Sequence, residues 1–441
     1  MITKAPTSSR KTEKWWLFIK ERFLKLAVFA SVFLLVKISG FISALWLSKL
    51  VTDVGQYGLF EYALSVGLLI AIPLNVGLQV AYPYFNIKLR ERGYRSLFYL
   101  HPVLYCSLIG LILIANHWWL GSLAPKHQLA LLIGGIIGIQ MMLSFILKSH
   151  EIISRAVLLD GGIFLVVNTY NLYIYLSGEV YRFDHLQYLL ELYLMALVSI
   201  STYHFWINRQ DFSWESYRDS LLFGRHLVLS SMIIIGLTNG ARILIEYFLG
   251  LEQVAFYSFY LRFAVAIILL QQVCNIVLFK KMYRSNAEKL DSYFSLFLVG
   301  ALLLSLSLWW VVPHLLYDWF PFFQEMNEMH QQLYYILSLH TIFWVSMAFN
   351  ENIIYREGLS SFMNRAFGVL FLMMLGVVWG MHQMGWLDLI SFAFVNLCFL
   401  FLAADIQFAL LRKHKDIRLR HNRLTNRLIL LFFLLSYCLI F

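Results

Sequence analysis

Apolar runs of about twenty residues recur along almost the whole chain, and they constrain the fold more than any other feature. An α-helix of that length crosses the hydrocarbon core of a bilayer, and lipid admits few other spanning structures. The chain has 441 residues, of which 60% are hydrophobic and 14% are charged, which is too apolar for a water-soluble core. The sequence therefore predicts an all-α integral membrane protein.

Twelve membrane-spanning helices are expected. Their predicted boundaries are 26–50, 58–82, 97–115, 129–147, 157–177, 186–207, 226–249, 254–279, 293–313, 332–355, 366–384 and 388–411. A basic run at 412–427 follows the last span, and fourteen apolar residues, 428–441, end the chain. At 1.5 Å per residue this end segment is about 21 Å long, which is short for a full crossing. We expect a short apolar helix, either a thirteenth span or, by preference, one that lies in the membrane interface.

Lysine and arginine are distributed unevenly between the two sides of the predicted membrane. The chain has 35 of them and a formal net charge of +10; 29 fall in segments on the side of the N-terminus, and 3 fall in or beside the opposite loops. Basic residues concentrate in cytoplasmic loops, so both ends of the twelve-helix core are predicted to be cytoplasmic. Contact with anionic membrane lipids explains the net charge, and no nucleic-acid partner is expected.

A polar segment near the middle of the chain, residues 208–225, separates six predicted spans from six. With this segment as a cytoplasmic linker, we predict an N-terminal six-helix lobe at 26–207 and a C-terminal six-helix lobe at 226–411. The segment 1–25 is basic and amphipathic, which is typical of a cytoplasmic interfacial helix. Residues 412–441 form the remaining basic loop and the short apolar helix.

The two halves resemble each other at an offset of 200 residues. A polar turn at Thr52–Gly58, between the first two spans, has a counterpart at Glu252–Ser258. The matching pairs are Val54 with Val254, Tyr57 with Tyr257, and Asn75 with Asn275. Together with the hydropathy, this register predicts an internal duplication. We expect Gly55 and Gly58 to let the chain reverse in the turn, and Pro73 to bend the second span.

These stretches resemble a known family. The segment TDVGQYGLFEYAL, followed by a helix that ends in NVGLQVAYPYF, is similar to the N-terminal signature of bacterial polysaccharide flippases. These flippases are the Wzx-like O-antigen branch of the multidrug/oligosaccharidyl-lipid/polysaccharide (MOP) superfamily. The second copy, GLEQVAFYSFYLRF, resembles the corresponding turn in their C-terminal half.

The resemblance implies two six-helix lobes around a central cavity that opens alternately to each side of the membrane. It also implies a cargo, an undecaprenyl-diphosphate-linked oligosaccharide repeat unit of O-antigen or a related surface polysaccharide. The cargo would pass from the cytoplasmic to the periplasmic leaflet of the bacterial inner membrane, for lipopolysaccharide biosynthesis. Polysaccharide polymerase and chain-length proteins would be partners.

Three cations lie inside predicted spans: Lys37, Arg242 and Arg262. An ionisable residue at the membrane centre costs about 2.5 kcal/mol or more and seldom faces lipid. A diphosphate head group needs such cations, because several donors together replace the water around its oxygens. The alternatives are that Arg242 and Glu246, four residues apart, neutralise each other, and that Lys37 snorkels or pairs with an acid on a neighbouring helix. Arg262 has no acid one turn away on its own helix and is the strongest candidate. For Lys37 and Arg262, a role in binding the cargo is also what the resemblance implies.

Polar residues in the second and eighth spans are candidates for sugar contacts. They are Asn75, Gln79, Gln271 and Asn275. The alternative, that these amides satisfy one another between helices, is favoured. Carboxylates at Glu246, Glu351 and Asp405 are candidates for carrying a coupling proton or cation, against the plainer reading that they are local helix-packing partners.

Other functional classes fit the sequence less well. A polymerase or lipid-linked glycosyltransferase of the same pathway needs a sizeable catalytic outer loop, whereas the longest outer loop, 314–331, contains no Lys or Arg. We therefore expect a transporter and not an enzyme. A major-facilitator carrier would have a GxxxDRxGRR-like loop after its second span, where this chain has NIKLRERGYRS. Another exporter of the same superfamily stays open. The four cysteines lie in apolar runs without metal-binding spacing, and no metal or cofactor is expected.

Overall fold

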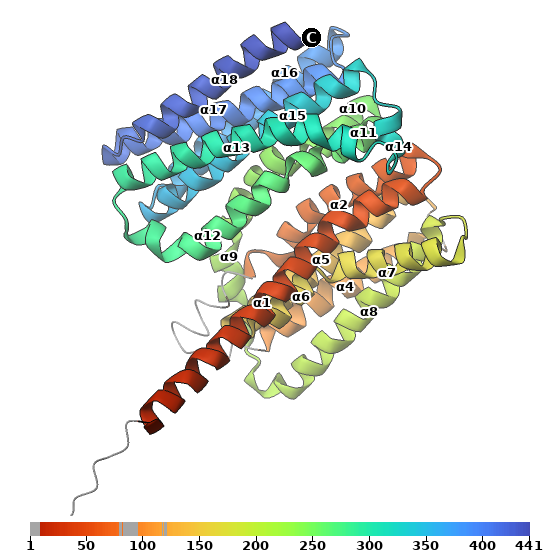
Figure 1. Ribbon diagram of the computed structural model, residues 1–441. Helices are drawn as coiled ribbons and strands as arrows, with labels where there is room; N and C mark the ends of the chain where they lie inside the picture. Colours follow the sequence, from red (N-terminus) through yellow and green to blue (C-terminus); the bar gives the residue numbers. More distant parts are fainter. Residues whose placement is uncertain (1–8, 79–81, 83–95, 117, 119–120) are drawn as a thin grey trace, which may run out of the picture. The chain divides into compact units, whose positions relative to one another are not determined.

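The chain folds into α-helices connected by short segments, as a computed structural model shows (Figure 1). The structure describes residues 9–78, 82, 96–116, 118 and 121–441. In the first part of the chain the helices are α1 (Ser9–Leu50), α2 (Val54–Asn75), α4 (Leu97–Ala115), α5 (Pro125–Ser149), α6 (Ile153–Asp160), α7 (Gly162–Ser177) and α8 (Phe183–Ile207). A short 3₁₀ helix, η4 (Arg209–Asp211), connects to the second part. There the helices are α9 (Trp214–Asn239), α10 (Ala241–Leu249), α11 (Leu251–Ala264), α12 (Ala266–Arg284), α13 (Ala287–Leu315), α14 (Pro321–Gln324), α15 (Glu328–Arg356), α16 (Ser360–Gln383), α17 (Leu389–Lys415) and α18 (Arg420–Ile440).

The prediction of an all-α membrane protein with about twelve spans is confirmed. Within the described residues, nine helices are long and apolar enough to cross a membrane, and the number reaches twelve if each of three bent helix pairs is one span. The bent pairs are α6 with α7, the end of α9 with α10, and α11 with the start of α12. The predicted tenth span corresponds to α15, which lies outside these twelve; its 29 residues are largely buried among other helices.

Two of the three bends coincide with a glycine. The break of 57° between α9 and α10 lies at Gly240, where an added Cβ would lie 2.2 Å from the Gly236 carbonyl oxygen. The break of 56° between α6 and α7 lies at Gly161, whose missing side chain leaves room for Val36 of α1. The break of 48° at Val265, between α11 and α12, has no proline or glycine to explain it.

The first turn is tighter than predicted. Helix α1 ends at Leu50 and α2 begins at Val54, so Gly55 and Gly58 lie inside α2 and do not reverse the chain. The Asp53 carboxylate accepts a hydrogen bond of 2.9 Å from the Gly55 N–H, which satisfies one of the free donors at a helix start. In the second copy, Gly250 forms the turn with φ of 94°, and α11 begins at the next residue. The first turn is therefore made by the start of the predicted segment Thr52–Gly58, around Asp53, and the second by Gly250, two residues before the predicted segment Glu252–Ser258.

Helix α2 contains Pro73 near its end and does not extend to residue 82 as one bent span. It ends at Asn75, and Val76 and Gly77 follow with positive φ of 47° and 70°. Glycine is needed at position 77 because an added Cβ would lie 2.4 Å from the Gly224 carbonyl oxygen.

The chain divides into two compact units. The first consists of Met1–Trp46, Pro73–Gly121 and Gly135–Arg225, and the second of Leu47–Ile72, Ser122–Gly134 and His226–Phe441. Most of α2 and the first turns of α5 thus pack with the C-terminal half of the chain. The predicted linker 208–225 ends where the second unit resumes.

In the first unit, α1 packs against α7 through polar contacts to its backbone. Asn168 donates a hydrogen bond of 3.1 Å to the Ser39 carbonyl oxygen, and Asn171 donates one of 2.9 Å to the Ser43 carbonyl oxygen. Such interhelical bonds keep polar side chains satisfied inside a membrane.

In the second unit, α15 is the central helix and contacts α11, α12, α13 and α17. Side-chain caps define where two long helices of this unit begin. Asn327 accepts from the His330 N–H at the start of α15, and Asp388 and Ser391 form a reciprocal capping box at the start of α17.

The C-terminal helix α18 is longer than the apolar run predicted, because it begins in the basic segment at Arg420 and has 21 residues. It lies along α13 and α17 of the same unit (Figure 1). The Asp291 side chain on α13 accepts hydrogen bonds of 2.9 Å and 2.7 Å from the N–H groups of His421 and Asn422. A carboxylate at a helix N-terminus is favoured by the helix dipole, which explains why the helix begins there.

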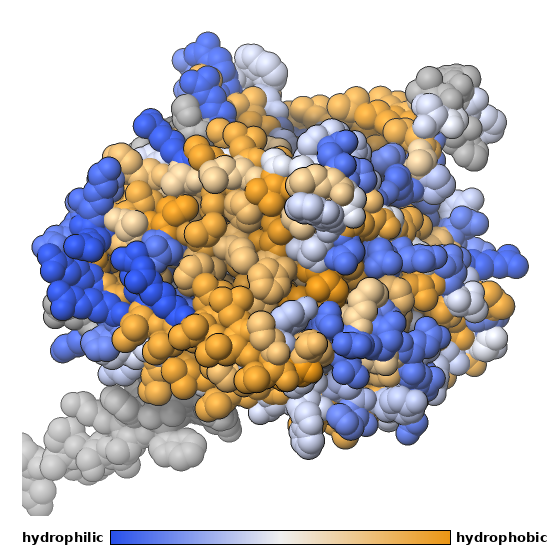
Figure 2. Space-filling view, turned by 90° about the horizontal axis from the view of Figure 1, so that it is seen from above, coloured by the Kyte–Doolittle hydropathy of each residue, from blue (hydrophilic) through white to orange (hydrophobic). Residues whose placement is uncertain are grey.

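The surface is apolar over wide areas that charge does not interrupt, as Figure 2 shows for one face. Large exposed apolar side chains occur on most long helices, for example Leu111 of α4, Leu303 of α13 and Leu372 of α16. Such surface is expected of helices that face lipid.

Candidate functional site

A cluster of buried charges lies in the second unit, around Glu61 of α2. The Glu61 side chain is 1% exposed. Its Oε1 accepts a hydrogen bond of 2.7 Å from Nε of Arg262, whose Nη2 contacts the same oxygen. Its Oε2 lies 3.4 Å from Nε of Arg242. One carboxylate on α2 therefore joins a guanidinium on α10 and another on α11; these three residues are called the Glu61 cluster.

Serine hydroxyls complete the surroundings of Arg242. Its Nε donates a hydrogen bond of 2.8 Å to Ser258 Oγ, and its Nη1 donates one of 3.4 Å to Ser65 Oγ. The side chains of Arg242 and Arg262 are 14% and 12% exposed. Both cations are thus nearly enclosed but still reachable.

Close helix packing positions Glu61. One turn before it, Gly58 lies against the start of α11, where an added Cβ would lie 1.9 Å from the Leu251 carbonyl oxygen. Two turns after it, Gly67 lies against α5, with an added Cβ at 3.0 Å from the Gly134 nitrogen. Small residues at such crossings let membrane helices approach closely, so α2 is held between α11 and α5. Gly58, predicted as a turn residue, instead serves this packing.

A second ion pair lies on the next turn of α10. Glu246 pairs with Lys126 of α5 at 2.5 Å, and the Lys126 Nζ also lies 6.0 Å from the centroid of the Tyr62 ring. Glu246 therefore neutralises Lys126. It is not the partner of Arg242, as the alternative from the sequence had it; Arg242 pairs with Glu61 instead. The Glu61 cluster and the Lys126–Glu246 pair together hold three cations and two carboxylates, a net charge of +1.

The arrangement is suited to holding an anion. Two guanidiniums converge on one pair of oxygens, and guanidinium forks match carboxylate and phosphate oxygens in geometry. In the structure the Glu61 carboxylate takes this position. Buried ion pairs are costly to assemble and costly to break on one side only, so the two arginines depend on an anionic partner.

Two of the three cations that the sequence singled out belong to one cluster. Arg242 and Arg262 meet at the Glu61 cluster in the second unit, whereas Lys37 belongs to the first unit. The Lys37 Nζ lies 5.7 Å from the centroid of the Phe33 ring. In the same unit, Lys148 and Asp160 pair with each other at 2.7 Å.

The amides proposed for sugar contacts have different surroundings. Asn75 is buried, donates to the Gly138 carbonyl oxygen at 3.1 Å and accepts from the Tyr105 hydroxyl at 3.3 Å, so it serves helix packing in the first unit. Asn275 accepts from Asn352 at 3.3 Å. Gln271 is 3% exposed, and its Nε2 has no hydrogen-bond partner within the described part of the chain. Gln79 lies outside the described residues.

The remaining candidates for ion coupling have partners. The Glu351 carboxylate accepts a hydrogen bond of 2.6 Å from the Tyr355 hydroxyl. Asp405 forms a two-pronged pair with Arg423 of α18, with both contacts at 2.8 Å. Asp405 thus helps to join α17 to α18.

Sequence reasoning missed Glu61, the residue that brings the cluster together. A signal was available, because Glu61 is an acid inside the predicted span 58–82, but it lies near the start of that span, where the cost of a charge is smaller than at the membrane centre. Lys126 lies between the spans predicted at 97–115 and 129–147, and nothing in its local sequence points to Glu246, which lies 120 residues away.

The fold resembles that of a transporter. Among solved structures, the chain is similar to one described as the inward-facing conformation of a multidrug resistance MATE family transporter of the MOP superfamily. The two chains share 15% identity, and the match has a TM-score of 0.56 and covers 88% of this chain and 99% of the other. At this identity the likeness shows the fold alone. No protein-family model and no curated protein matches the chain.

Proposed function

We propose that this chain, which has the fold of a MATE transporter, is a flippase for an undecaprenyl-diphosphate-linked oligosaccharide. It moves the repeat unit of an O-antigen or related surface polysaccharide from the cytoplasmic to the periplasmic leaflet of the inner membrane. Alternating access between inward-open and outward-open states carries the head group across, while the polyprenyl tail stays in lipid. The N-terminus is cytoplasmic in this proposal.

The single observation that supports this cargo best is the Glu61 cluster. Two arginines inside the membrane share one carboxylate, so an incoming diphosphate can replace that carboxylate as their partner. A diphosphate offers more oxygens and more charge than one carboxylate, and Arg binds such oxygens in a two-pronged manner. We assign Arg242 and Arg262 to the diphosphate, and Lys37 to a further contact with the anionic head group during the cycle.

The secondary roles follow from the same scheme. Gln271 has an unsatisfied buried amide and is the best placed of the proposed sugar contacts, ahead of Asn75, Gln79 and Asn275. Upward movement of an anion needs a driving force, and a charge that crosses the field gains about 2.3 kcal/mol per 100 mV. Glu246, Glu351 and Asp405 remain the proposed sites of a coupling proton or cation. Polysaccharide polymerase and chain-length proteins are the proposed downstream partners.

A second candidate is export of small amphipathic compounds. The fold similarity to a multidrug MATE transporter favours it. The charge of the site argues against cationic compounds, because the Glu61 cluster and the Lys126–Glu246 pair together carry a net charge of +1. A polymerase or lipid-linked glycosyltransferase is the remaining alternative.

The test uses cells that lack this protein. If the protein is the flippase, the lipid-linked repeat unit accumulates on the inner leaflet of these cells, wild type clears it, and Arg262→Gln clears it at least tenfold more slowly. The matched control is Arg365→Gln, at an exposed arginine of α16, which should restore clearance fully. Blotting establishes equal amounts of each variant in the membrane.

Three results would contradict the proposal. Single repeat units that reach the outer surface without the protein but fail to polymerise would show that it acts after flipping, as a polymerase. Absence of any accumulation, together with sensitivity of the cells to amphipathic drugs, would favour the second candidate. Full clearance of the repeat unit by Arg262→Gln would show that the Glu61 cluster does not bind the cargo.

A further inference from the structure

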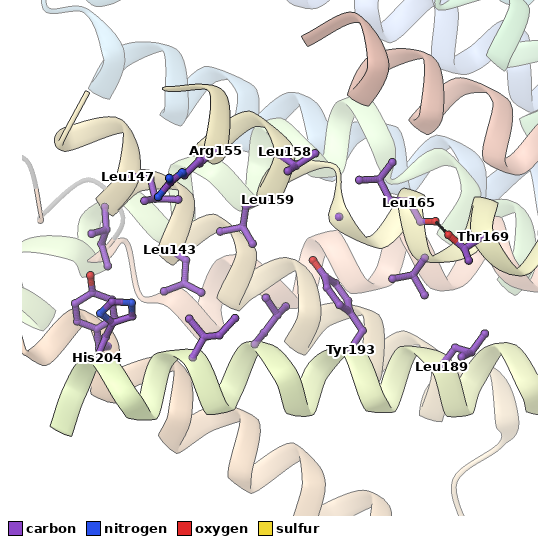
Figure 3. A pocket seen from close by; sticks show the side chains of 16 residues that line it. Leu143, Leu147, Arg155, Leu158, Leu159, Leu165, Thr169, Leu189, Tyr193 and His204 are labelled. Atoms are coloured by element: carbon purple, nitrogen blue, oxygen red, sulfur yellow. Dashed lines mark hydrogen bonds between the residues drawn. The ribbon is translucent and has the colours of Figure 1, made fainter. Parts of the chain in front are cut away.

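A long apolar groove lies inside the first unit, between α5, α6, α7 and α8. Its volume is about 820 Å³. Leu143 and Leu147 of α5, Leu158 and Leu159 of α6, and Leu165 of α7 line one side, and α8 lines the other from Leu189 to His204 (Figure 3). All of its lining residues belong to the first unit. It is called the α8 groove below.

We propose that the α8 groove binds one hydrocarbon chain of an anionic glycerophospholipid, with the lipid phosphate against Arg155. The proposal concerns a resident lipid; one of its arguments, that Arg155 is available to this lipid, rests on the cargo site proposed above.

The groove is long enough to hold a hydrocarbon chain that lies in one leaflet of a bilayer. From Leu189 to His204 is fifteen residues of α8, or about 22 Å at 1.5 Å per residue. Half of a hydrocarbon core of roughly 30 Å is about 15 Å, so a chain that lies in one leaflet runs along most of the groove.

The interior of the groove offers few polar partners to a hydrophilic ligand. The Tyr193 hydroxyl accepts a hydrogen bond of 2.9 Å from Gln140, and the Thr169 hydroxyl donates one of 2.9 Å to the Leu165 carbonyl oxygen of its own helix. The other lining side chains between the two ends are leucine, isoleucine and valine. Apolar cavities stay free of water and bind hydrocarbon, so a sugar or a free phosphate does not fit there.

Polar groups meet at one end of the groove. Arg155 and His204 lie at the same end, on either side of its mouth (Figure 3), and the His204 ring stacks on Tyr99 with centroids 5.1 Å apart. Arg155 is exposed, and among the described residues no carboxylate lies within ion-pair distance of it. A cation at the open end of an apolar groove is complementary to a lipid, which places a phosphate at the end of its hydrocarbon chains.

The charge pattern of the sequence identifies the leaflet. Arg155 lies in the segment 148–156, which is predicted to be cytoplasmic, and the cytoplasmic leaflet carries the anionic lipids. The cargo's diphosphate is assigned to Arg242 and Arg262, so Arg155 is available to the phosphate of another lipid. These arguments favour an anionic glycerophospholipid over the cargo's polyprenyl tail.

The experiment measures lipid binding by the full-length protein in detergent. Phosphatidylglycerol is titrated against the unfolding temperature, and native mass spectrometry counts the lipids retained. Parallel titrations use phosphatidylcholine, a polyprenyl phosphate and inorganic phosphate. We expect phosphatidylglycerol to stabilise the wild type at concentrations at least fivefold below those needed for phosphatidylcholine, and inorganic phosphate to have no effect.

Two variants test the contact with the lipid phosphate and the contact with the hydrocarbon chain separately. Arg155→Gln should weaken binding of phosphatidylglycerol about fivefold, to the level of phosphatidylcholine, as expected for one basic residue near an anionic lipid. Leu158→Trp should fill the groove and remove the bound lipid from the mass spectrum. The matched controls, Arg365→Gln and Leu372→Trp, lie on exposed positions of α16 in the other unit and should bind as wild type does. If Leu158→Trp does not fold, Leu189→Trp fills the groove from α8.

Each opposite outcome overturns the proposal. Equal stabilisation by phosphatidylglycerol and phosphatidylcholine would show that Arg155 does not select an anionic head group. Retention of lipid by a folded groove-filling variant would place the lipid elsewhere. Tighter binding of polyprenyl phosphate than of phosphatidylglycerol would assign the groove to the cargo tail.

Discussion

Removal of the Glu61 carboxylate should destabilise the protein more than removal of either arginine that it contacts. Glu61→Gln leaves two guanidiniums, 12% and 14% exposed, without the carboxylate that they share. Breaking a buried pair from one side costs about 3–5 kcal/mol, because the remaining charge is left uncompensated. Arg262→Gln is milder, since Glu61 keeps Arg242 at 3.4 Å, and we expect a cost of about 1–3 kcal/mol.

A double-mutant cycle measures how strongly the two charges depend on each other. Glu61→Gln/Arg262→Gln leaves only Arg242, which still donates to Ser258 and Ser65. The double variant should therefore be more stable than the sum of the single effects predicts, by about 1–3 kcal/mol.

The assay is reversible unfolding in mixed micelles, with Glu179→Gln, at an exposed loop carboxylate, as the control that should stay within about 0.5 kcal/mol of wild type. A cost of Arg262→Gln equal to or above that of Glu61→Gln would refute the reasoning. So would a coupling energy near zero, because Glu61 would then not be the group that holds the cluster together.

Two further predictions concern the helix contacts around this site and at the C-terminus. Gly58→Ala should destabilise the protein by about 1–3 kcal/mol despite the gain in helix propensity, because the new Cβ would lie 1.9 Å from a backbone oxygen of α11. Gly376→Ala in α16, where an added Cβ meets nothing within 4 Å, should instead stabilise by up to about 1 kcal/mol, and equal effects of the two in the same unfolding assay would be inconsistent with this packing. Asp291→Ala should cost about 1–3 kcal/mol, because the carboxylate that accepts hydrogen bonds from two backbone N–H groups at the start of α18 is lost. Limited proteolysis should then cut before α18 faster than in wild type, and an unchanged cleavage rate would show that the carboxylate does not fix this helix.

The spans were predictable because the bilayer imposes one physical requirement on each of them. A run of apolar residues long enough to cross is visible without knowledge of its neighbours. The ends of helices were less accessible to sequence reasoning. Gly55 and Gly58 indicate a turn by composition, but the tertiary contact of Gly58 with α11 determines its role. Likewise α18 begins at Arg420, eight residues before its apolar run, because Asp291 on another helix satisfies its first N–H groups.

The cations of the site were predictable one at a time, but their partners were not. A charge inside a span is conspicuous by itself. Its partner depends on which helices meet, and here the pairs are far apart in sequence: Arg262 with Glu61 across 201 residues, and Lys126 with Glu246 across 120. The i, i+4 rule suggested Arg242 with Glu246 because local spacing is what a single sequence shows. In the structure, Arg242 pairs with Glu61 of α2, and Glu246 pairs with Lys126 of α5.

The position of Glu61 has a consequence for transport under the proposed mechanism. If a diphosphate replaces the carboxylate at Arg242 and Arg262, Glu61 loses both partners while it is 1% exposed. A buried, unpaired carboxylate costs several kcal/mol, so Glu61 must either take up a proton or move with α2 to another cation or to water. Both outcomes change the contacts of α2, which Gly58 and Gly67 hold tightly against α11 and α5. Binding of the anion is thereby linked to a shift of one helix between two packed neighbours, and such a shift is what a transporter needs to exchange one open state for the other.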